Sequence, residues 1–395
     1  MSLRVLHLIP SISPRRGGPS QAVLAMSSAL RQKGVDAAIL TTDDDGPDRL
    51  PIPIGQWHER EGVPVLAFPR WSPAARPLRP LREFALSPAL LRWLRRNVRE
   101  WELLHVHALF SFPSTAGMAV ARRQGVPYVL RTIGQLQRWS LQQSAGRKRL
   151  LLRLIERRNL GGAAALHFTS EAEQREAAAL GLATPSFVLP LGVELPPGAE
   201  PAGVLGPVRF LFLSRLHPKK QLPVLLEALA ELRRRHPGAA WQLDVAGEGE
   251  PAYVIELQQQ AERLAIADRV RWHGFVAGEA KAALLHRADW FVLPSAAENF
   301  GIAAAEALAA GVPAILSPGV ALAAVVAETG AGLVCEPTPQ NLTAALEACL
   351  HPPPACMRRA ARQLAVEHFS WEVIGGQLVD QYSQLVQAAP AGHIC

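Results

Sequence analysis

The residues best suited to chemistry lie in the second half of the chain, in the segment PSAAENFGIAAAEALAAGVPAI at residues 294–315. Glu298 directly follows an expected buried strand, and Glu306 lies about two turns into an Ala-rich helix. A carboxylate among small apolar residues is unfavourable unless it accepts hydrogen bonds. We therefore expect Glu306 to bind ligand hydroxyls such as those of a ribose, and the alternative is that it merely faces solvent.

The turn between these two carboxylates leads into the helix at Phe300, Gly301 and Ile302. The first backbone N–H groups of a helix have no acceptor within it, and they lie at the positive end of the helix dipole. We expect these three residues to offer N–H groups to a phosphate.

A pair of cations follows another expected strand, 208–214, in the segment SRLHPKKQL. Arg215 and Lys220 lie between that strand and the start of the next helix. Two positive side chains beside a helix N-terminus suit a diphosphate, whereas an ordinary basic turn is the alternative.

A glycine-rich turn, VAGEGEPA, follows the next expected strand. Gly247, Gly249 and Ala252 match a loose dinucleotide-binding fingerprint, in which glycines let the backbone approach a phosphate or a base closely. No acidic residue follows at a strand end about 20 positions later, as that fingerprint requires. We therefore expect Gly247 to line a phosphate- or base-binding site and not a hydride-transfer site.

The first half of the chain has two further candidates at strand ends. Gly17 and Gly18 follow the first expected strand and precede a helix, as in a phosphate-accepting turn, although a simple strand–helix turn has the same pattern. His107 ends the strand 103–107, and His105 has the same side-chain parity. Each histidine therefore has either a ligand-binding role or a core or capping role.

The net charge of +7 is unevenly placed. Residues 1–200 contain 26 Lys/Arg against 16 Asp/Glu, whereas residues 201–395 contain 15 against 18. This asymmetry indicates an anionic partner for the first half, or else a genome that favours Arg. Anionic lipid and phosphate-bearing substrates both fit. The basic residues lack interleaved aromatics and a known motif, so we expect no nucleic acid.

Two basic amphipathic stretches lie at 90–101 and 146–160. In the first, Leu91, Leu94, Val98 and Trp101 recur at helical spacing among four arginines. Such stretches either lie on anionic membranes or are ordinary surface helices. The four cysteines include no C-x-x-C pair, and no segment reaches about 18 uncharged apolar residues. We expect a cytoplasmic protein, soluble or peripheral on the inner face of the membrane.

Short apolar runs alternate with amphipathic stretches along nearly the whole chain, which is typical of parallel sheets covered by helices on both faces. The expected strands are residues 3–10, 37–42, 63–69, 103–107, 127–132, 165–170, 186–190, 208–214, 241–247, 270–275, 290–295, 313–317 and 332–336. The expected helices include residues 20–33, 114–124, 171–180, 221–235, 251–264, 278–287, 301–310 and 319–329.

A Pro- and Gly-rich break at 193–207 indicates a linker. We therefore predict an α/β protein with two Rossmann-like, doubly wound parallel-sheet domains, at 1–192 and 208–370, that face a central cleft. Residues 371–395 are expected to form a helix that packs back on the first domain, followed by a tail. The acidic run Asp43-Asp44-Asp45 precedes Gly-Pro and is interpreted as a solvated turn, not a metal site.

These motifs make the chain resemble glycosyltransferase family 4, retaining enzymes of the two-Rossmann B-type fold. Glu298 and Glu306 match that family's Glu-x7-Glu motif, and Arg215 and Lys220 match its Arg-x4-Lys pair. The segment VLPLGVEL at 188–195 resembles the family's V-I-P-N-G-V-D segment. The chain departs from the family in two places. Leu stands at position 191 where Asn is usual, and Gln stands at position 221 where Gly is usual.

The resemblance implies roles for these residues. Arg215 and Lys220 would neutralise the donor diphosphate, while Glu306 would bind the ribose. Glu298 would contact the hydroxyls of the donor sugar, and His107 would lie against that sugar.

The loop RTIGQLQRWSL at 131–141 looks like the acceptor-side loop of family members that build sugar polymers. Arg131, Arg138 and Trp139 are therefore candidates for holding a sugar or a lipid phosphate, with a structural loop as the alternative.

The function implied by the resemblance is a retaining, metal-independent hexosyltransferase without a bound cofactor. Its donor would be a nucleotide-diphosphate sugar, and its acceptor a glycan or a lipid-linked molecule in surface polysaccharide or glycolipid biosynthesis. The alternatives are a non-catalytic nucleotide-sugar-binding protein and a phosphorylase or epimerase of the same fold.

Overall fold

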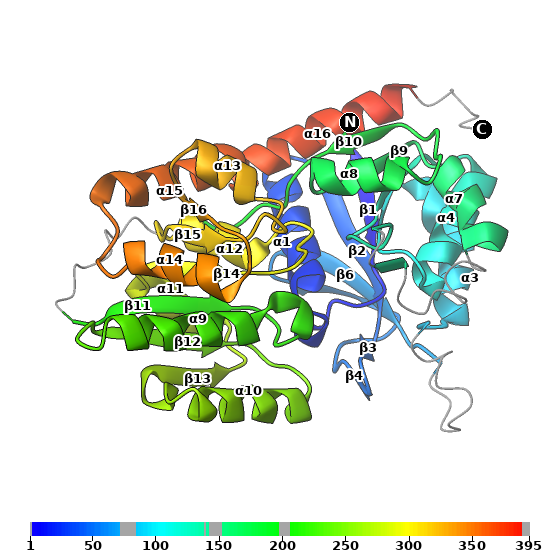
Figure 1. Ribbon diagram of the computed structural model, residues 1–395. Helices are drawn as coiled ribbons and strands as arrows, with labels where there is room; N and C mark the ends of the chain where they lie inside the picture. The colour runs from blue at the N-terminus through cyan, green and yellow to red at the C-terminus, as the bar shows by residue number, and fades with distance from the viewer. Residues whose placement is uncertain (1, 72–83, 138–139, 142–151, 197–205, 389–395) are drawn as a thin grey trace. The chain divides into compact units, whose positions relative to one another are not determined.

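The computed structural model describes residues 2–71, 84–137, 140–141, 152–196 and 206–388 (Figure 1). The chain divides into two compact units. Unit 1 comprises Met1–Gly192 together with Trp371–Cys395, and unit 2 comprises Val193–Ser370. Each unit is an α/β fold with its own sheet, as the alternating sequence pattern predicts.

Unit 1 is built on an eight-stranded sheet with the order β10-β9-β8-β7-β1-β2-β6-β5. Neighbouring strands are parallel, except that β5 runs antiparallel to β6 at one edge. The strands are β1 (Arg4–Leu8), β2 (Asp36–Thr42), β5 (Trp57–Arg60), β6 (Val63–Phe68), β7 (Leu103–His107), β8 (Tyr128–Arg131), β9 (Ala165–Phe168) and β10 (Ser186–Val188). A small separate hairpin joins β3 (Asp44–Asp45) to β4 (Asp48–Arg49).

Helices cover both faces of this sheet (Figure 1). They are α1 (Gly18–Gln32), α3 (Pro88–Asn97), α4 (Phe112–Gln124), α7 (Arg157–Gly161), α8 (Glu171–Ala178) and the C-terminal α16 (Trp371–Ala388). One face carries an apolar core in which α3 and α4 pack on β1, β7 and β8. On the other face α1 packs against α16, and Gly375 of α16 lies against Ala29 of α1.

Unit 2 is a six-stranded, entirely parallel sheet with the order β13-β12-β11-β14-β15-β16. Its strands are β11 (Val208–Leu213), β12 (Trp241–Ala246), β13 (Val270–Gly274), β14 (Trp290–Leu293), β15 (Ala314–Leu316) and β16 (Gly332–Val334). Its helices are α9 (Leu222–Arg235), α10 (Pro251–Arg263), α11 (Gly278–Arg287), α12 (Ile302–Ala309), α13 (Ala323–Glu328), α14 (Pro339–Ala348) and α15 (Ala355–His368). The strand order reverses between β11 and β14, as in a doubly wound Rossmann fold.

The solvated turn predicted at Asp43 and Asp44 is wrong. Both carboxylates are buried, and they belong to an ion-pair network. Asp44 pairs with Arg16 and with the fully buried Arg70, and Asp43 pairs with Arg49. A buried carboxylate is tolerated when cations and hydrogen-bond donors satisfy it, and two of these arginines, Arg16 and Arg70, are distant in sequence from Asp44.

The basic stretch at 90–101 forms α3 and a 3-10 turn, and three of the four predicted apolar residues, Leu94, Val98 and Trp101, are buried. Leu90, Leu94 and Val98 are fully buried, whereas Leu91 is only partly buried. The second basic stretch, 146–160, lies partly outside the described residues. Its described part forms a π-helix at Leu152–Glu156 followed by α7.

Candidate active site

The candidate residues of unit 2 lie where its strand order reverses. The neighbouring strands β11 and β14 are parallel, so the loops that follow them leave the same edge of the sheet. Arg215 and Lys220 belong to the loop after β11, and Glu298 belongs to the loop after β14. This is the position at which open α/β sheets bind ligands.

The loop after β11 ends in a 3-10 turn, Pro218–Lys220, that leads into α9. Gln221 caps that helix in the left-handed conformation, with φ of 56°. Glycine reaches this conformation without a steric penalty, which explains why glycine is usual at this position in the family that the chain resembles. With Gln at this position, the loop still carries both cations, Arg215 and Lys220.

Lys220 is the buried cation of this loop. Lys220 is 9% exposed, and its ammonium group forms an ion pair with the carboxylate of Glu298. Burial, together with the neighbouring Arg215 and Lys219, lowers the pKa of Lys220 to about 7, whereas the contact with Glu298 favours the ammonium form. Arg215, by contrast, is exposed. The structure thus joins one member of each sequence motif in a single ion pair.

Backbone hydrogen bonds hold Glu298 in this position. The N–H of Ala296 donates to the carbonyl of Lys219 over 2.9 Å, which ties the two loops together. The N–H of Glu298 donates to the carbonyl of Gly319 over 2.7 Å. A Cβ at Gly319 would overlap the Ala296 carbonyl, so only glycine allows this close approach.

The start of α12 follows directly. Gly301 caps the helix with φ of 90°, and Phe300 is buried against Phe369 in an edge-to-face contact at 5.6 Å between ring centres. Ile302 is the first helical residue. Backbone N–H groups in this first turn lack an acceptor within the helix, as expected for a phosphate-binding N-terminus.

Glu306, on α12, is only partly buried and has a partner that sequence reasoning missed. The ammonium of Lys281, on α11, donates to Glu306 Oε1 over 2.7 Å. The two residues are 25 positions apart, and no spacing in the sequence connects them. The partner satisfies the carboxylate, yet Glu306 remains about a fifth exposed and accessible to a ligand.

Gly247 and Gly249 serve close backbone packing. A Cβ at Gly247 would overlap the carbonyl oxygen of Ser214, and a Cβ at Gly249 would overlap that of Leu216. The N–H of Gly247 already donates to the carbonyl of Gly274 over 2.7 Å. The glycine-rich turn therefore shapes the loop that carries Arg215, and the N–H of Gly247 is not free for a phosphate.

Unit 1 has an equivalent reversal point between β1 and β7. Gly17, in the loop after β1, has φ of 79° and caps α1, whose first residue is Gly18. His107 is the last residue of β7 and is fully buried. Both predicted candidates therefore lie at the carboxyl edge of neighbouring strands.

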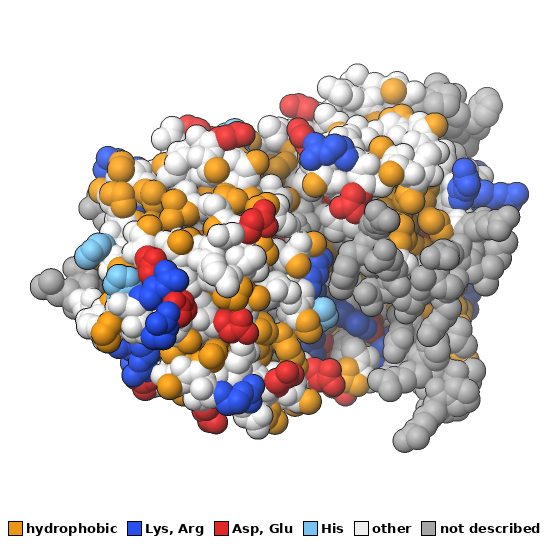
Figure 2. All heavy atoms as spheres, viewed as in Figure 1, with side chains coloured by type: hydrophobic (Ala, Val, Ile, Leu, Met, Phe, Trp, Pro, Cys, Tyr) orange, Lys and Arg blue, Asp and Glu red, His pale blue; other side chains and the backbone are white. Residues whose placement is uncertain are grey.

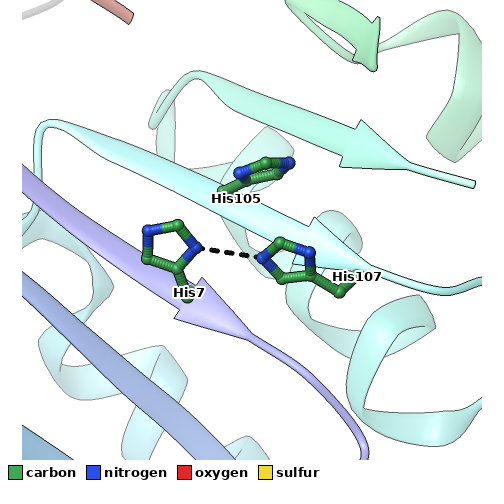
Figure 3. A group of neighbouring side chains, drawn as sticks. All are labelled: His7, His105 and His107. Carbon is green, nitrogen blue, oxygen red and sulfur yellow. Dashed lines mark hydrogen bonds between the residues drawn. The ribbon is translucent and has the colours of Figure 1, made fainter. Parts of the chain in front are cut away.

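His107 belongs to a layer of buried histidines on one face of the unit 1 sheet (Figure 3). His7 Nδ1 lies 3.0 Å from His107 Nε2, and His105 lies beside both rings. His167 completes the layer from β9. Burial lowers the pKa of His7 and of His167 to about 3, and it lowers the pKa of His105 and of His107 well below the usual value. These imidazoles are neutral at pH 7.

Hydrogen bonds fix the tautomers of two of these rings. His167 Nε2 lies 2.8 Å from the carbonyl of Leu189, which can only accept, so His167 donates from Nε2. Its Nδ1 then accepts from His105 Nε2 at 3.4 Å, and His105 Nδ1 accepts from the hydroxyl of Tyr382 at 2.6 Å. The structure therefore supports a core role for His105, whose hydrogen bond with Tyr382 anchors α16 to the sheet.

Arg131, the first of the acceptor-side candidates, ends β8 and is 1% exposed. It is in register with His107 on one side and with His167 on the other. Arg138 and Trp139, the other two candidates, lie outside the described residues.

The unit 2 arrangement can stabilise a leaving anion. Arg215 and Lys220 supply two cations, and α12 supplies the positive end of a helix dipole at the same edge of the sheet. Preorganised donors of this kind stabilise negative charge as it develops on a leaving oxygen. Among the described residues, the group whose side-chain atoms best suit a metal ion is His7, His105 and His107, in the other unit.

Two families of known proteins match the chain. Residues 202–364 match the family described as "Glycosyl transferases group 1", and residues 17–192 match the "Glycosyl transferase 4-like domain". The two matches together cover both units.

Curated relatives agree with these matches. Glycogen synthase of Mycobacterium tuberculosis is 36% identical over 181 residues, which are 45% of this chain and 42% of that protein's length. The chain thus spans less than half of that relative. A GDP-mannose:cellobiosyl-diphosphopolyprenol alpha-mannosyltransferase of Komagataeibacter xylinus is 26% identical over 98% of this chain and 95% of its own length. A D-inositol 3-phosphate glycosyltransferase of Kineococcus radiotolerans is 27% identical over the same two shares.

Solved structures share the fold. Anabaena HepE in complex with UDP and glucose has a TM-score of 0.74 at 20% identity, and the likeness covers 97% of this chain and 100% of that one. Sucrose-phosphate synthase from Thermosynechococcus elongatus has a TM-score of 0.75 at 19% identity, over 98% and 100%. The chain therefore belongs to the glycosyltransferases of the B type, in the family 4-like group.

Proposed function

We propose that this protein is a retaining, metal-independent hexosyltransferase that uses a nucleotide-diphosphate sugar as donor. The observation that carries the proposal is the contact of Lys220 with Glu298 at the reversal point of the unit 2 sheet. Arg215 lies on the same loop as Lys220, and the N-terminus of α12 follows Glu298 in the sequence. A diphosphate bound there would meet two cations and a helix dipole.

Each residue then has a defined role. Arg215 and Lys220 bind the donor diphosphate and stabilise the negative charge that develops as it leaves. Glu298 exchanges part of its contact with Lys220 for the hydroxyls of the donor sugar. Glu306 accepts hydrogen bonds from the ribose while Lys281 holds it in place.

The anomeric carbon becomes oxocarbenium-like as the diphosphate departs. The acceptor hydroxyl enters on the leaving-group face, and a phosphate oxygen takes its proton. This course retains the anomeric configuration and requires no protein nucleophile. Arg131, Arg138 and Trp139 are proposed to bind the acceptor.

The names of the relatives support a nucleotide-sugar donor and an acceptor that carries phosphate. The Komagataeibacter protein is named for GDP-mannose and a diphosphopolyprenol acceptor, and the Kineococcus protein for inositol 3-phosphate. HepE was solved with UDP and with UDP-glucose. We infer for this chain a nucleotide-diphosphate sugar as donor and a glycan or lipid-linked acceptor, as in the name of the Komagataeibacter protein.

Transfer of a labelled sugar tests this proposal. We expect nucleoside diphosphate release and a glycosylated product from one of the UDP-, GDP- or ADP-sugars, unchanged in excess EDTA, with the donor's anomeric configuration in the product by NMR. Formation of a sugar 1-phosphate from a glycan and inorganic phosphate, without any nucleotide, would indicate a phosphorylase, and nucleotide-sugar binding without turnover would indicate a non-catalytic protein. Inversion of the anomeric configuration would contradict the retaining mechanism. Loss of activity in EDTA that only a divalent ion restores would contradict metal independence.

We also propose a peripheral contact with anionic membrane. Among the helices that the structure describes, none is long and apolar enough to cross a membrane. The apolar side of α3 is buried in the core of unit 1, so only its arginines are available and the contact is electrostatic. Figure 2, by contrast, shows basic and acidic side chains interspersed over the surface of unit 2.

Vesicle sedimentation tests this contact. Each arginine near an anionic surface contributes about 1 kcal/mol, and screening shortens the Debye length from ~10 Å at 0.1 M salt to ~3 Å at 1 M. We expect binding to phosphatidylglycerol vesicles that 1 M salt abolishes and that joint replacement of Arg92, Arg95, Arg96 and Arg99 by Gln weakens. Equal sedimentation with phosphatidylcholine, or none at low salt, would contradict it.

A further inference from the structure

Within the part of unit 1 that the structure describes, the buried histidine layer contains a cation, Arg131, with no hydrogen-bonded counter-ion. Arg131 is 1% exposed, and its Nε, Nη1 and Nη2 atoms have no hydrogen-bond partner among the described residues. Although burial lowers the pKa of Arg131 to about 10, the guanidinium stays protonated at pH 7. An unpaired buried charge is strongly unfavourable, so this arrangement calls for an anion.

Glu173 is the carboxylate that interacts electrostatically with Arg131, but its oxygens already accept hydrogen bonds from other groups. Glu173 favours the charged form of Arg131. Its Oε1 accepts from the hydroxyl of Thr132 and the N–H of Gly134, and its Oε2 accepts from the N–H and hydroxyl of Thr169. All four lone-pair positions are thus used, and none is left for the guanidinium.

Two imidazole nitrogens of the same layer are also unpartnered within the described residues: His7 Nε2 and His107 Nδ1. His7 and His107 share one hydrogen bond between Nδ1 and Nε2, so one of the free nitrogens carries a proton. The His7–His107 pair therefore offers one free N–H, Arg131 offers its guanidinium N–H groups, and neither ring carries a negative charge.

The backbone at this edge of the sheet is strained. Ala108 and Phe110, just after β7, have φ of 78° and 54°, and Ile133, just after β8, has φ of 53°. A left-handed conformation is a true outlier for a β-branched residue such as Ile. Strained residues cluster at ligand sites, and these three follow the two strands that end in His107 and Arg131.

We propose that Arg131, His7 and His107 bind an oxyanion, and that in the cell this is a phosphate group of the acceptor substrate. The assignment to the acceptor rests on the proposed function, whereas the anion site itself does not. An oxyanion would pair with the guanidinium and accept a hydrogen bond from the one orphan imidazole nitrogen that carries a proton. It would also explain why a layer of neutral histidines surrounds a buried arginine.

A metal ion fits the same residues less well. The ligand atoms of His7, His105 and His107 lie within 4.8 Å of one another. However, both nitrogens of His105 already contact Tyr382 and His167, and Arg131 would place a positive charge beside the ion. The charge balance favours an anion.

Thermal unfolding with inorganic phosphate as the probe tests the proposal on the full chain. At constant ionic strength, phosphate should raise the Tm of the wild-type unit 1 in a saturable way. Arg131→Met removes the unpaired charge while keeping the length of the side chain. We expect this variant to have a higher Tm than wild type without phosphate, and at least ~10-fold weaker phosphate binding.

The controls separate the other outcomes. Arg123→Gln, which removes an exposed arginine of the same unit, should keep the phosphate response, and Arg131→Lys should keep part of it. A lower Tm for Arg131→Met without phosphate, or failure of this variant to fold, would indicate a structural arginine and overturn the proposal. An undiminished phosphate response in Arg131→Met would also overturn it, as would stabilisation by Zn²⁺ that EDTA reverses with no response to phosphate.

Two competing compounds identify the source of the anion. A separate measurement of nucleotide binding distinguishes failure of this proposal from failure of the proposed function. Glucose 6-phosphate represents a soluble phosphate acceptor, and farnesyl diphosphate represents a lipid diphosphate. The compound that competes best with inorganic phosphate identifies the source, and competition by neither would overturn the assignment to the acceptor. UDP and GDP binding is measured on the same samples. A phosphate response without nucleotide binding would contradict the donor assignment alone.

Discussion

Lys220→Ala should weaken nucleoside diphosphate binding by about 10- to 100-fold while leaving unit 2 folded. A charge-assisted hydrogen bond contributes roughly 1.5–3 kcal/mol to binding. Lys220 is only 9% exposed, so water screens its hydrogen bond to the diphosphate little. Arg215→Ala should have a smaller effect because Arg215 is exposed. Isothermal titration calorimetry with UDP, GDP and ADP measures both, and circular dichroism checks the fold.

Arg271→Ala is the matched control because it removes an exposed cation from the same unit. It should bind the nucleotide as the wild type does. Affinity equal to wild type in both Lys220→Ala and Arg215→Ala would remove these residues from the donor site.

The same lysine makes donor binding depend on pH. Because its pKa lies at about 7, Lys220 loses its charge as the pH rises from 7 to 9, and affinity should fall by up to about tenfold per unit. The guanidinium of Lys220→Arg stays protonated over this range, so that variant should show a flatter profile.

Unit 1 should unfold in mild acid. In the folded unit the pKa values of the four histidines of the layer lie below the unfolded value of about 6.5. Below pH 6.5 the unfolded chain therefore binds more protons than the folded unit, and the free energy of unfolding decreases. For His7 and His167, whose pKa is about 3, the loss by pH 5 is about 2 kcal/mol each. His105 and His107 act in the same direction, against a total stability of roughly 5–15 kcal/mol.

The groups that face these rings strengthen the effect. Arg131 disfavours protonation of all four imidazoles, and the hydroxyl of Tyr382 donates to His105. Calorimetry between pH 7 and 5 measures the Tm of unit 1. Added nucleoside diphosphate should raise the Tm of unit 2 only, which shows which of the two unfolding transitions belongs to unit 1. A transition of unit 1 that does not move over this range would contradict the prediction.

Replacement of single histidines apportions the effect. His7→Gln removes one titrating group, so the slope of stability against pH should fall by about 1.4 kcal/mol per unit. The exposed His236, on unit 2, provides the control: His236→Gln should leave the slope of unit 1 unchanged.

Much of the fold could be predicted because strand–helix alternation is local. Near-continuous apolar runs mark parallel strands, and each expected strand is present. The antiparallel edge strand β5 was missed because its exposed, polar sequence WHER lacks the buried-strand pattern. The buried Asp43 and Asp44 were missed because their partner Arg70 lies 26 or more residues away.

The candidate site divides in the same way. Arg215, Lys220, Glu298 and Glu306 could be identified because each lies at a fixed distance from a strand end. The contact of Lys281 with Glu306 could not, because it depends on how α11 packs beside α12. His7, His105, His107 and His167 come from three different strands, and only the register of the sheet brings them together with Arg131.

Hydrogen–deuterium exchange with a bound nucleoside diphosphate tests the central claim most directly. The donor is claimed to bind at the edge of the unit 2 sheet where the strand order reverses. UDP, GDP or ADP, whichever binds, should slow exchange at residues 214–221 and 298–303, with little change in β16 at the far edge of that sheet. Slowed exchange elsewhere, with both of these segments unchanged, would contradict it.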